Sequence, residues 1–220
     1  MSSHDYERRK VVLLHGLART SRSMRPIDKF LKREGFSVFN LNYPSRKKSI
    51  EELGKFVREQ IQSNEEKGIK LDFVTHSMGG IILRYIMKVD PLPNLGRVVM
   101  LGPPNQGSEV VDRLSKLKIF KLMGPASLQL GTSSDGFVNT LGKVDFDLGI
   151  IAGNRSINPF LSFLISGPND GKVSVERTKV IGMNDFMIVH CSHSFYMSNL
   201  NVKEEVRSYL KNGYFVKKCR

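Results

Sequence analysis

The chain of 220 residues has no tryptophan, two cysteines and no long uninterrupted hydrophobic run. Cys191 and Cys219 are too few for a disulfide framework or for a set of spaced thiol metal ligands, so the sequence requires no oxidising compartment. The longest apolar patch, Phe160 to Ile165, is much shorter than the ~18 residues that a membrane-spanning helix needs. We therefore expect a soluble chain without a transmembrane segment.

The first ten residues, MSSHDYERRK, are polar and continue directly into the strand-like sequence VVLLHG. A secretory signal peptide needs an apolar core, which this segment does not contain. We therefore expect residues 1–10 to form a polar tail and the chain to be cytoplasmic, unless a leader was removed.

Acidic residues are scarce, because 21 Asp and Glu stand against 34 Lys and Arg and give a formal net charge of +13. Such a balance is typical of proteins that meet nucleic acid or anionic membranes. One basic cluster lies between Arg19 and Lys48, and another, Lys217, Lys218 and Arg220, ends the chain. Most Phe and Tyr residues lie in apolar stretches and cannot stack on bases. We expect no nucleic-acid partner, a mostly solvated basic surface and a weak association with anionic lipid.

The rest of the composition, 40% hydrophobic and 25% charged, is that of an ordinary globular protein. Apolar runs of five or six residues alternate with longer segments of helical period, which is typical of parallel strands buried under helices on both faces. The predicted strands are Val11–His15, Ser37–Tyr43, Leu71–His76, Arg97–Leu101, Leu148–Ala152 and Phe186–Val189. The expected fold class is α/β: a doubly wound, mainly parallel six-stranded sheet flanked by helices.

Helices are predicted over Ser21–Glu34, Ser49–Glu66, Met78–Val89 and Asn199–Lys211. The first two segments open with a serine that can cap the helix, and Glu52 follows Ser49 as in a capping box. Residues 119–146 contain several glycines and no clear period, so we expect an irregular, lid-like excursion there. Because no linker or internal repeat divides the sequence, we predict a single domain over residues 1–220.

The strongest local pattern is LDFVTHSMGGIILRYIM, in which a predicted strand leads into Ser77, two glycines and a helix. This is the context of a nucleophile elbow, where the sharp turn needs small residues two positions before and after the serine. Gly79 meets that need and Gly80 lets the helix approach the strand, whereas Thr75 departs from the G-x-S-x-G pattern. The alternative is an ordinary helix N-cap serine.

A serine hydroxyl needs a histidine to take its proton and a carboxylate to orient that histidine. Active sites of open α/β sheets lie at the carboxyl ends of the strands. Asp147 and Asp185 immediately precede predicted strands and so belong to the opposite edge. Asp170 lies in the loop GPNDGKVSV after the fifth strand and is the predicted carboxylate, with a simple turn residue as the alternative.

Two histidines compete for the role of base. His190 closes the last predicted strand, whereas His193 stands three residues into the following loop, from which it can lean back toward Ser77. We predict His193 as the base and His190 as a satisfied polar residue or a supporting partner. His76 precedes Ser77 on the strand and is expected to point away from it. Cys191 is the alternative nucleophile, but it has no elbow.

The order Ser77, Asp170, His193 is that of the α/β-hydrolase triad. The chain resembles an α/β-hydrolase, and it is most similar to small bacterial lipases and esterases and to the lipase-like domain of GPI-inositol deacylases. The resemblance spans Val11 to Leu210. It rests on five landmarks in order: LLHGL, THSMGG, LGPPNQGS, NDGKV, and a histidine before a closing helix.

The resemblance implies an oxyanion hole formed by the backbone N–H groups of Leu17 and Met78, and a structural role for His15. Met78 also begins a helix, where the peptide dipoles favour a negative charge. The loop Pro103–Gly107 either lines the pocket or is a plain turn. Full α/β-hydrolases have eight strands, but the residues before Val11 could not provide the first two, and no long cap domain is inserted. The resemblance is therefore to a minimal α/β-hydrolase, which implies a shallow, open pocket.

These features predict a serine carboxylic-ester hydrolase of the lipase or esterase kind, which takes an acyl ester through an acyl-enzyme on Ser77 and needs no metal or cofactor. Phe160, Leu161, Phe163 and Leu164 would flank an acyl chain or, as we expect for most of them, pack in the core. The same triad would also serve an acyltransferase or a thioesterase. A further alternative is a non-catalytic protein that binds lipid or a partner on the same scaffold.

Overall fold

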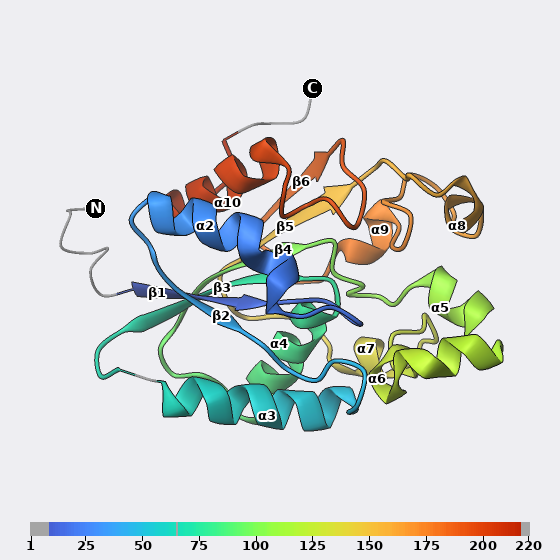
Figure 1. Cartoon of the computed structure of the whole chain (residues 1–220), viewed down its shortest axis with the longest axis horizontal. Coiled ribbons are helices and arrows are strands. Elements are labelled where there is room, and N and C mark those ends of the chain that lie inside the picture. The colour runs from blue at the N-terminus through green and yellow to red at the C-terminus, as the bar shows by residue number, and fades with distance from the viewer. Residues whose placement is uncertain (1–8, 65, 217–220) are drawn as a thin grey trace.

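The computed structural model describes residues 9–64 and 66–216 and has a six-stranded parallel sheet at its centre (Figure 1). The strand order is β2-β1-β3-β4-β5-β6, and every neighbouring pair is parallel. The strands are β1 (Arg9–Leu14), β2 (Ser37–Leu41), β3 (Lys70–His76), β4 (Leu95–Leu101), β5 (Leu148–Gly153) and β6 (Asp185–Val189). The predicted sheet is confirmed, with strand ends that differ by at most two residues.

Two expectations concern the ends of the chain. The predicted polar tail covers residues 1–10, but Arg9 and Lys10 begin β1. Residues 1–8 lie outside the described residues, and so does the basic cluster Lys217, Lys218 and Arg220.

Helices cover the sheet on both sides (Figure 1). The helices α3 (Ile50–Ser63) and α4 (Met78–Val89) lie on one side, and α2 (Arg25–Arg33) and α10 (Leu200–Asn212) lie on the other. Each side has its own buried apolar cluster. Because both faces are covered, the strands are nearly continuous apolar runs, and every residue of β5 is buried.

Serine caps are predicted at the starts of two helices, and the structure confirms one of them. Ser49 accepts a hydrogen bond from the Glu52 backbone N–H, and the Glu52 carboxylate accepts one from the Ser49 N–H, so the capping box is confirmed. The predicted cap at Ser21 is wrong, because Ser21 begins the 3-10 turn η1 (Ser21–Met24) and makes no cap. The α-helix starts only at Arg25, since proline in the next position favours the first helical turn.

The direction in which successive strands are added to the sheet reverses at β1. From β1 the chain moves outward to β2 and then returns past β1 to form β3 on its other side. This reversal makes the carboxyl ends of β1 and β3 the topological switch point, the place where open α/β sheets bind ligands.

Short helices connect the later strands near the same edge of the sheet (Figure 1). The connection from β4 to β5 contains α5 (Glu109–Leu114), η2 (Lys118–Met123), α6 (Pro125–Leu128) and α7 (Phe137–Thr140), and that from β5 to β6 contains α8 (Pro159–Phe163) and α9 (Val175–Thr178). The segment 119–146 therefore includes several helical turns, and its Val138 is fully buried in the core. Within the described residues, no helix has the length and apolar character to cross a bilayer.

The Ser49→Ala variant should lower the free energy of unfolding by about 1 kcal/mol, because it leaves the Glu52 backbone N–H at the start of α3 without its side-chain acceptor. Urea unfolding followed by circular dichroism measures this change. Ser63→Ala, near the other end of α3, removes only a bond from its hydroxyl to the Glu59 carbonyl and serves as control. Equal losses in the two variants would contradict the capping role.

Candidate active site

Ser77 joins β3 to α4 in a left-handed backbone conformation, with φ of +53° and ψ of −123°. A Cβ atom on Gly79 would lie 2.6 Å from the Leu14 carbonyl oxygen, so α4 can pass this close to β1 only with glycine there. Ser77 stands at the N-cap position of α4, but its side chain makes no capping hydrogen bond. The strain therefore points to a nucleophile elbow and argues against an ordinary N-cap serine.

The loop after β1 lies directly against Ser77. A Cβ atom on Gly16 would lie 3.2 Å from the Ser77 Cβ, and Ala18 is the other non-glycine residue with a positive φ among the described residues, at +54°. Leu17 stands between them, and Met78 is the first residue of α4. The two backbone N–H groups assigned by resemblance to an oxyanion hole thus belong to segments that meet at Ser77.

His15 holds the backbone of the loop after β1 in place through hydrogen bonds and ring stacking. Its Nδ1 lies 3.0 Å from the Gly16 carbonyl oxygen, and its Nε2 accepts the Tyr43 backbone N–H at 3.3 Å. The Tyr43 hydroxyl donates to the His15 carbonyl, and the two rings stack with centroids 3.9 Å apart. Burial lowers the pKa of His15, so the ring is neutral and serves to position the backbone.

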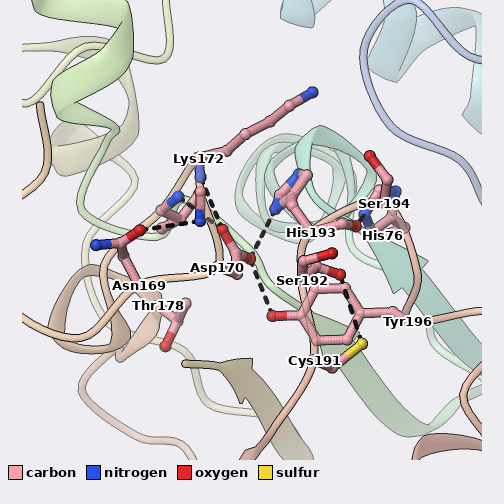
Figure 2. A network of polar contacts seen from close by, with 12 residues as sticks. His76, Asn169, Asp170, Lys172, Thr178, Cys191, Ser192, His193, Ser194 and Tyr196 are labelled. Carbon is pink, nitrogen blue, oxygen red and sulfur yellow. Dashed lines mark hydrogen bonds and ion pairs between the residues drawn. The ribbon is translucent and has the colours of Figure 1, made fainter. Parts of the chain in front are cut away.

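Asp170 and His193 form a buried hydrogen-bonded pair (Figure 2). The His193 Nδ1 lies 2.7 Å from Asp170 Oδ2, which also accepts the Tyr196 hydroxyl at 3.0 Å. The other carboxylate oxygen accepts the backbone N–H groups of Lys172 and Val173, both at 2.9 Å. Asp170 therefore holds a tight turn and is bonded to a histidine at the same time.

The His193 loop packs against the residue that precedes Ser77. The His76 Nε2 lies 2.9 Å from the His193 carbonyl oxygen, and the two imidazole rings are 4.8 Å apart. Since Nδ1 of His193 is bonded to Asp170, Nε2 is its nitrogen that remains for proton transfer. No hydrogen bond joins the Ser77 hydroxyl to His193 or to any other residue in the described part of the chain.

Sequence reasoning missed two supporting residues. His76 was expected only to point away from Ser77, but its ring contacts the loop of the predicted base. Burial lowers the pKa of His76 well below its usual value, so it stays neutral and donates Nε2–H to the His193 carbonyl. Tyr196 is fully buried beneath Asp170, and burial raises the pKa of its phenol, which remains a donor. Neither role has a local sequence signal, since each depends on segments far apart in the chain.

Two candidates remain, His190 and Cys191. His190 is exposed, with its Nδ1 3.2 Å from the Asn154 side-chain oxygen, which fits the expected satisfied polar residue. Cys191 is buried, and burial raises the pKa of its thiol, which disfavours the thiolate that a cysteine nucleophile needs. Among the described residues no group of three or more His, Cys, Asp or Glu side chains could hold a metal ion.

The loop Pro103–Gly107 has a supporting role. Asn105 is buried, and its side chain donates to the Thr178 carbonyl at 2.8 Å. The Arg84 guanidinium of α4 donates to the Asn105 carbonyl at 2.9 Å. These bonds join the loop to α4 and α9.

A cavity of about 180 Å³ adjoins the Asp170–His193 pair. Its lining includes Leu161 from α8 and Lys172. The expected core packing of the nearby phenylalanines is wrong, because Phe160 is 81% exposed and Phe163 is 90% exposed. The physical reason is that α8 has only five residues and stands at the sheet edge, with no further layer to cover its outer side (Figure 1).

Comparison with known proteins gives a family and a set of structural neighbours. Residues 6–135 match the family described as "Putative serine esterase (DUF676)", which includes Ser77 but ends before Asp170. No curated protein matches the chain.

Similar solved structures cover most of the chain at low identity. The mature lipase BlEst2 of Bacillus licheniformis is 18% identical, with 94% of this chain and 92% of that chain covered and a TM-score of 0.69. An esterase of Pyrococcus furiosus is 19% identical, covers 93% and 82%, and has a TM-score of 0.63. The phospholipase PlaB of Legionella pneumophila is 20% identical with a TM-score of 0.63, and the chain spans 45% of its length while 78% of this chain is covered.

At these identities the structural likeness shows the fold, which is that of the α/β-hydrolases. The family match covers more than half of the sequence and includes the elbow. The chain therefore belongs to the DUF676 family, and the resemblance to α/β-hydrolases of the lipase and esterase kind is confirmed.

Proposed function

We propose that the protein is a serine hydrolase that cleaves carboxylic esters through an acyl-enzyme on Ser77. The proposal rests mainly on one observation: the loop that carries the buried, hydrogen-bonded Asp170–His193 pair packs against His76, which immediately precedes a left-handed serine at the switch point of the sheet. Membership of a family described as serine esterases and lipase-like neighbours support the same reaction class.

His193 is the base in this scheme. Its Nδ1–H is donated to Asp170, so the Nε2 lone pair is available to take the Ser77 proton as Oγ attacks the acyl carbonyl. The imidazolium that forms lies against the Asp170 side chain, whose two oxygens together take part in four hydrogen bonds. The same proton then passes to the leaving alcohol, and water repeats the cycle to release the acyl group.

The oxyanion is stabilised by the backbone N–H groups of Leu17 and Met78. Both come from segments held rigidly, one by the His15–Tyr43 stack and the other by the start of α4. A donor of this kind is worth about 3 kcal/mol in the transition state, because it is already aimed at the developing charge. No part of this scheme requires a cofactor or a metal ion.

The Ser77→Ala variant should lose labelling by a fluorophosphonate probe and lower p-nitrophenyl ester hydrolysis by about a thousandfold or more, because no other hydroxyl occupies the elbow. Gel fluorescence and initial rates measure these effects. Cys191→Ala is the control and should label like the wild type. A wild-type protein that does not react with the probe would favour a non-catalytic protein on this scaffold.

The two histidines give a matched pair of variants. His193→Gln should reduce kcat about a thousandfold, since it removes the base bonded to Asp170, whereas His190→Gln should leave kcat nearly unchanged. Initial rates with a short-chain p-nitrophenyl ester show which of the two histidines is the base. The assignment of His193 fails if His190→Gln shows the larger loss.

Tyr196→Phe should lower kcat about tenfold with little change in KM, because it removes one donor from Asp170 Oδ2 and leaves the buried ring in place. The exposed Tyr214 offers the control substitution Tyr214→Phe. Steady-state kinetics separate the two parameters. A rise in KM at constant kcat would show that Tyr196 acts on substrate binding instead.

A further inference from the structure

The short helix α8 presents an apolar outer side to solvent. Phe160 and Phe163 are 81% and 90% exposed, and Ile157 immediately before the helix is 63% exposed. These residues recur at intervals of three, which places them on one side of a helical turn. Burial in the interior cannot explain them, so this side is available for an apolar partner.

This apolar side lies beside the candidate active site. Ile157 and Leu161 line the same cavity as His193 and Lys172. Phe195, two residues after His193, is a further exposed aromatic residue at 51%. Figure 1 shows α8 standing out from the molecule at the end toward which the strands point.

More exposed apolar side chains occur in the connection after β4, which is near the same end of the molecule (Figure 1). Leu117, Leu122 and Leu128 are 50%, 65% and 50% exposed. The carboxyl edge of the sheet thus has apolar side chains on two sides of the Ser77 region.

Three of the loops at this edge are strongly cationic, whereas the connection after β4, residues 102–147, has five acids and five cations. The connections that follow β1, β2 and β5, residues 15–24, 42–49 and 154–174, contain one acid, Asp170, which is buried and bonded to His193. Their cations are Arg19, Arg22, Arg46, Lys47, Lys48, Arg155 and Lys172, and all except the half-buried Lys48 are exposed. By contrast, the loops at the amino edge mix Asp and Glu with Lys.

Two of these cations stand at the site itself. Arg19 donates from Nη2 to the Ser194 hydroxyl at 3.3 Å, and Ser194 lines the cavity beside His193. The Lys172 side chain extends away from the Asp170–His193 pair in Figure 2. The positive charge therefore surrounds the region where an ester would enter.

We propose that the carboxyl edge docks on an anionic lipid surface, with Ile157, Phe160 and Phe163 inserted and the surrounding cations against the headgroups. Exposed aromatic residues next to Lys and Arg are the combination that inserts into the boundary of headgroups and acyl chains. A protein partner would need only the apolar part, whereas the seven cations of these three connections, whose one acid is bonded to His193, favour an anionic surface. In this orientation the Ser77 region is directed at the lipid.

Co-sedimentation with vesicles tests the docking, in a Ser77→Ala background so that no ester is hydrolysed. We expect binding to vesicles of phosphatidylcholine mixed with phosphatidylglycerol, weaker binding to phosphatidylcholine alone, and a decrease as salt screens the charges. Replacing both aromatics, Phe160→Ser with Phe163→Ser, should lower the partition coefficient about tenfold or more. Val89→Ser with Ile181→Ser is the control, because those exposed residues lie at the amino edge.

A second pair of variants tests the charge. Arg155→Gln with Lys172→Gln should weaken binding to the anionic vesicles about fivefold for each cation removed and leave binding to phosphatidylcholine unchanged. Lys67→Gln with Lys70→Gln removes the same net charge at the amino edge and should have little effect.

Four results would overturn the proposal: no binding to either vesicle, equal binding to both, equal losses in the test and control pairs, or a dimer that the Phe160 and Phe163 substitutions dissociate. The last result would assign this side of α8 to a second copy of the chain. Because the binding assay uses a protein without the nucleophile, its outcome is independent of whether Ser77 hydrolyses esters.

Discussion

The candidate site depends on the hydrogen bonds of the buried Asp170 side chain. It joins the connection after β5 to the loop after β6, since it accepts two backbone N–H groups from its own turn and bonds to His193 and Tyr196 from the other loop. A buried charge costs several kcal/mol unless its oxygens are fully hydrogen-bonded. Four donors meet that condition, and the same bonds fix the position of the His193 ring.

The second constraint is the close approach of α4 to β1. Ser77 adopts a left-handed conformation that costs about 1–3 kcal/mol, which the surrounding packing must offset. The Ser77 N–H bonds to the Leu101 carbonyl at 2.9 Å, and Gly79 lets the helix lie against Leu14. Ser77 directly follows His76, whose ring contacts the His193 loop that Asp170 holds. The two constraints therefore meet through the contact between His76 and His193.

The sequence predicts features that depend on local patterns and misses those that depend on distant contacts. The six strands, the elbow and the capping box at Ser49 follow from apolar runs and turn residues, which act over a few positions. The cap at Ser21 failed because the next proline moved the helix start. The contact of His76 with the His193 loop, and of Tyr196 with Asp170, joins segments 117 and 26 residues apart, and no spacing rule reports such contacts.

The exposed phenylalanines of α8 show the limit of hydrophobicity as a sign of burial. The apolar run 160–165 resembles a core segment, but only one side of it faces inward. On that side Leu161 of α8 lines the cavity, and Ile165, just after the helix, is buried. The other side has no layer above it, because the sheet ends at this edge and its neighbours are cationic loops. Under the proposed function, a chain that directs a reactive serine toward an apolar ester can place apolar residues there at the cost of exposing them in water. Under the proposed docking, the exposed basic residues around them determine which kind of surface those residues meet.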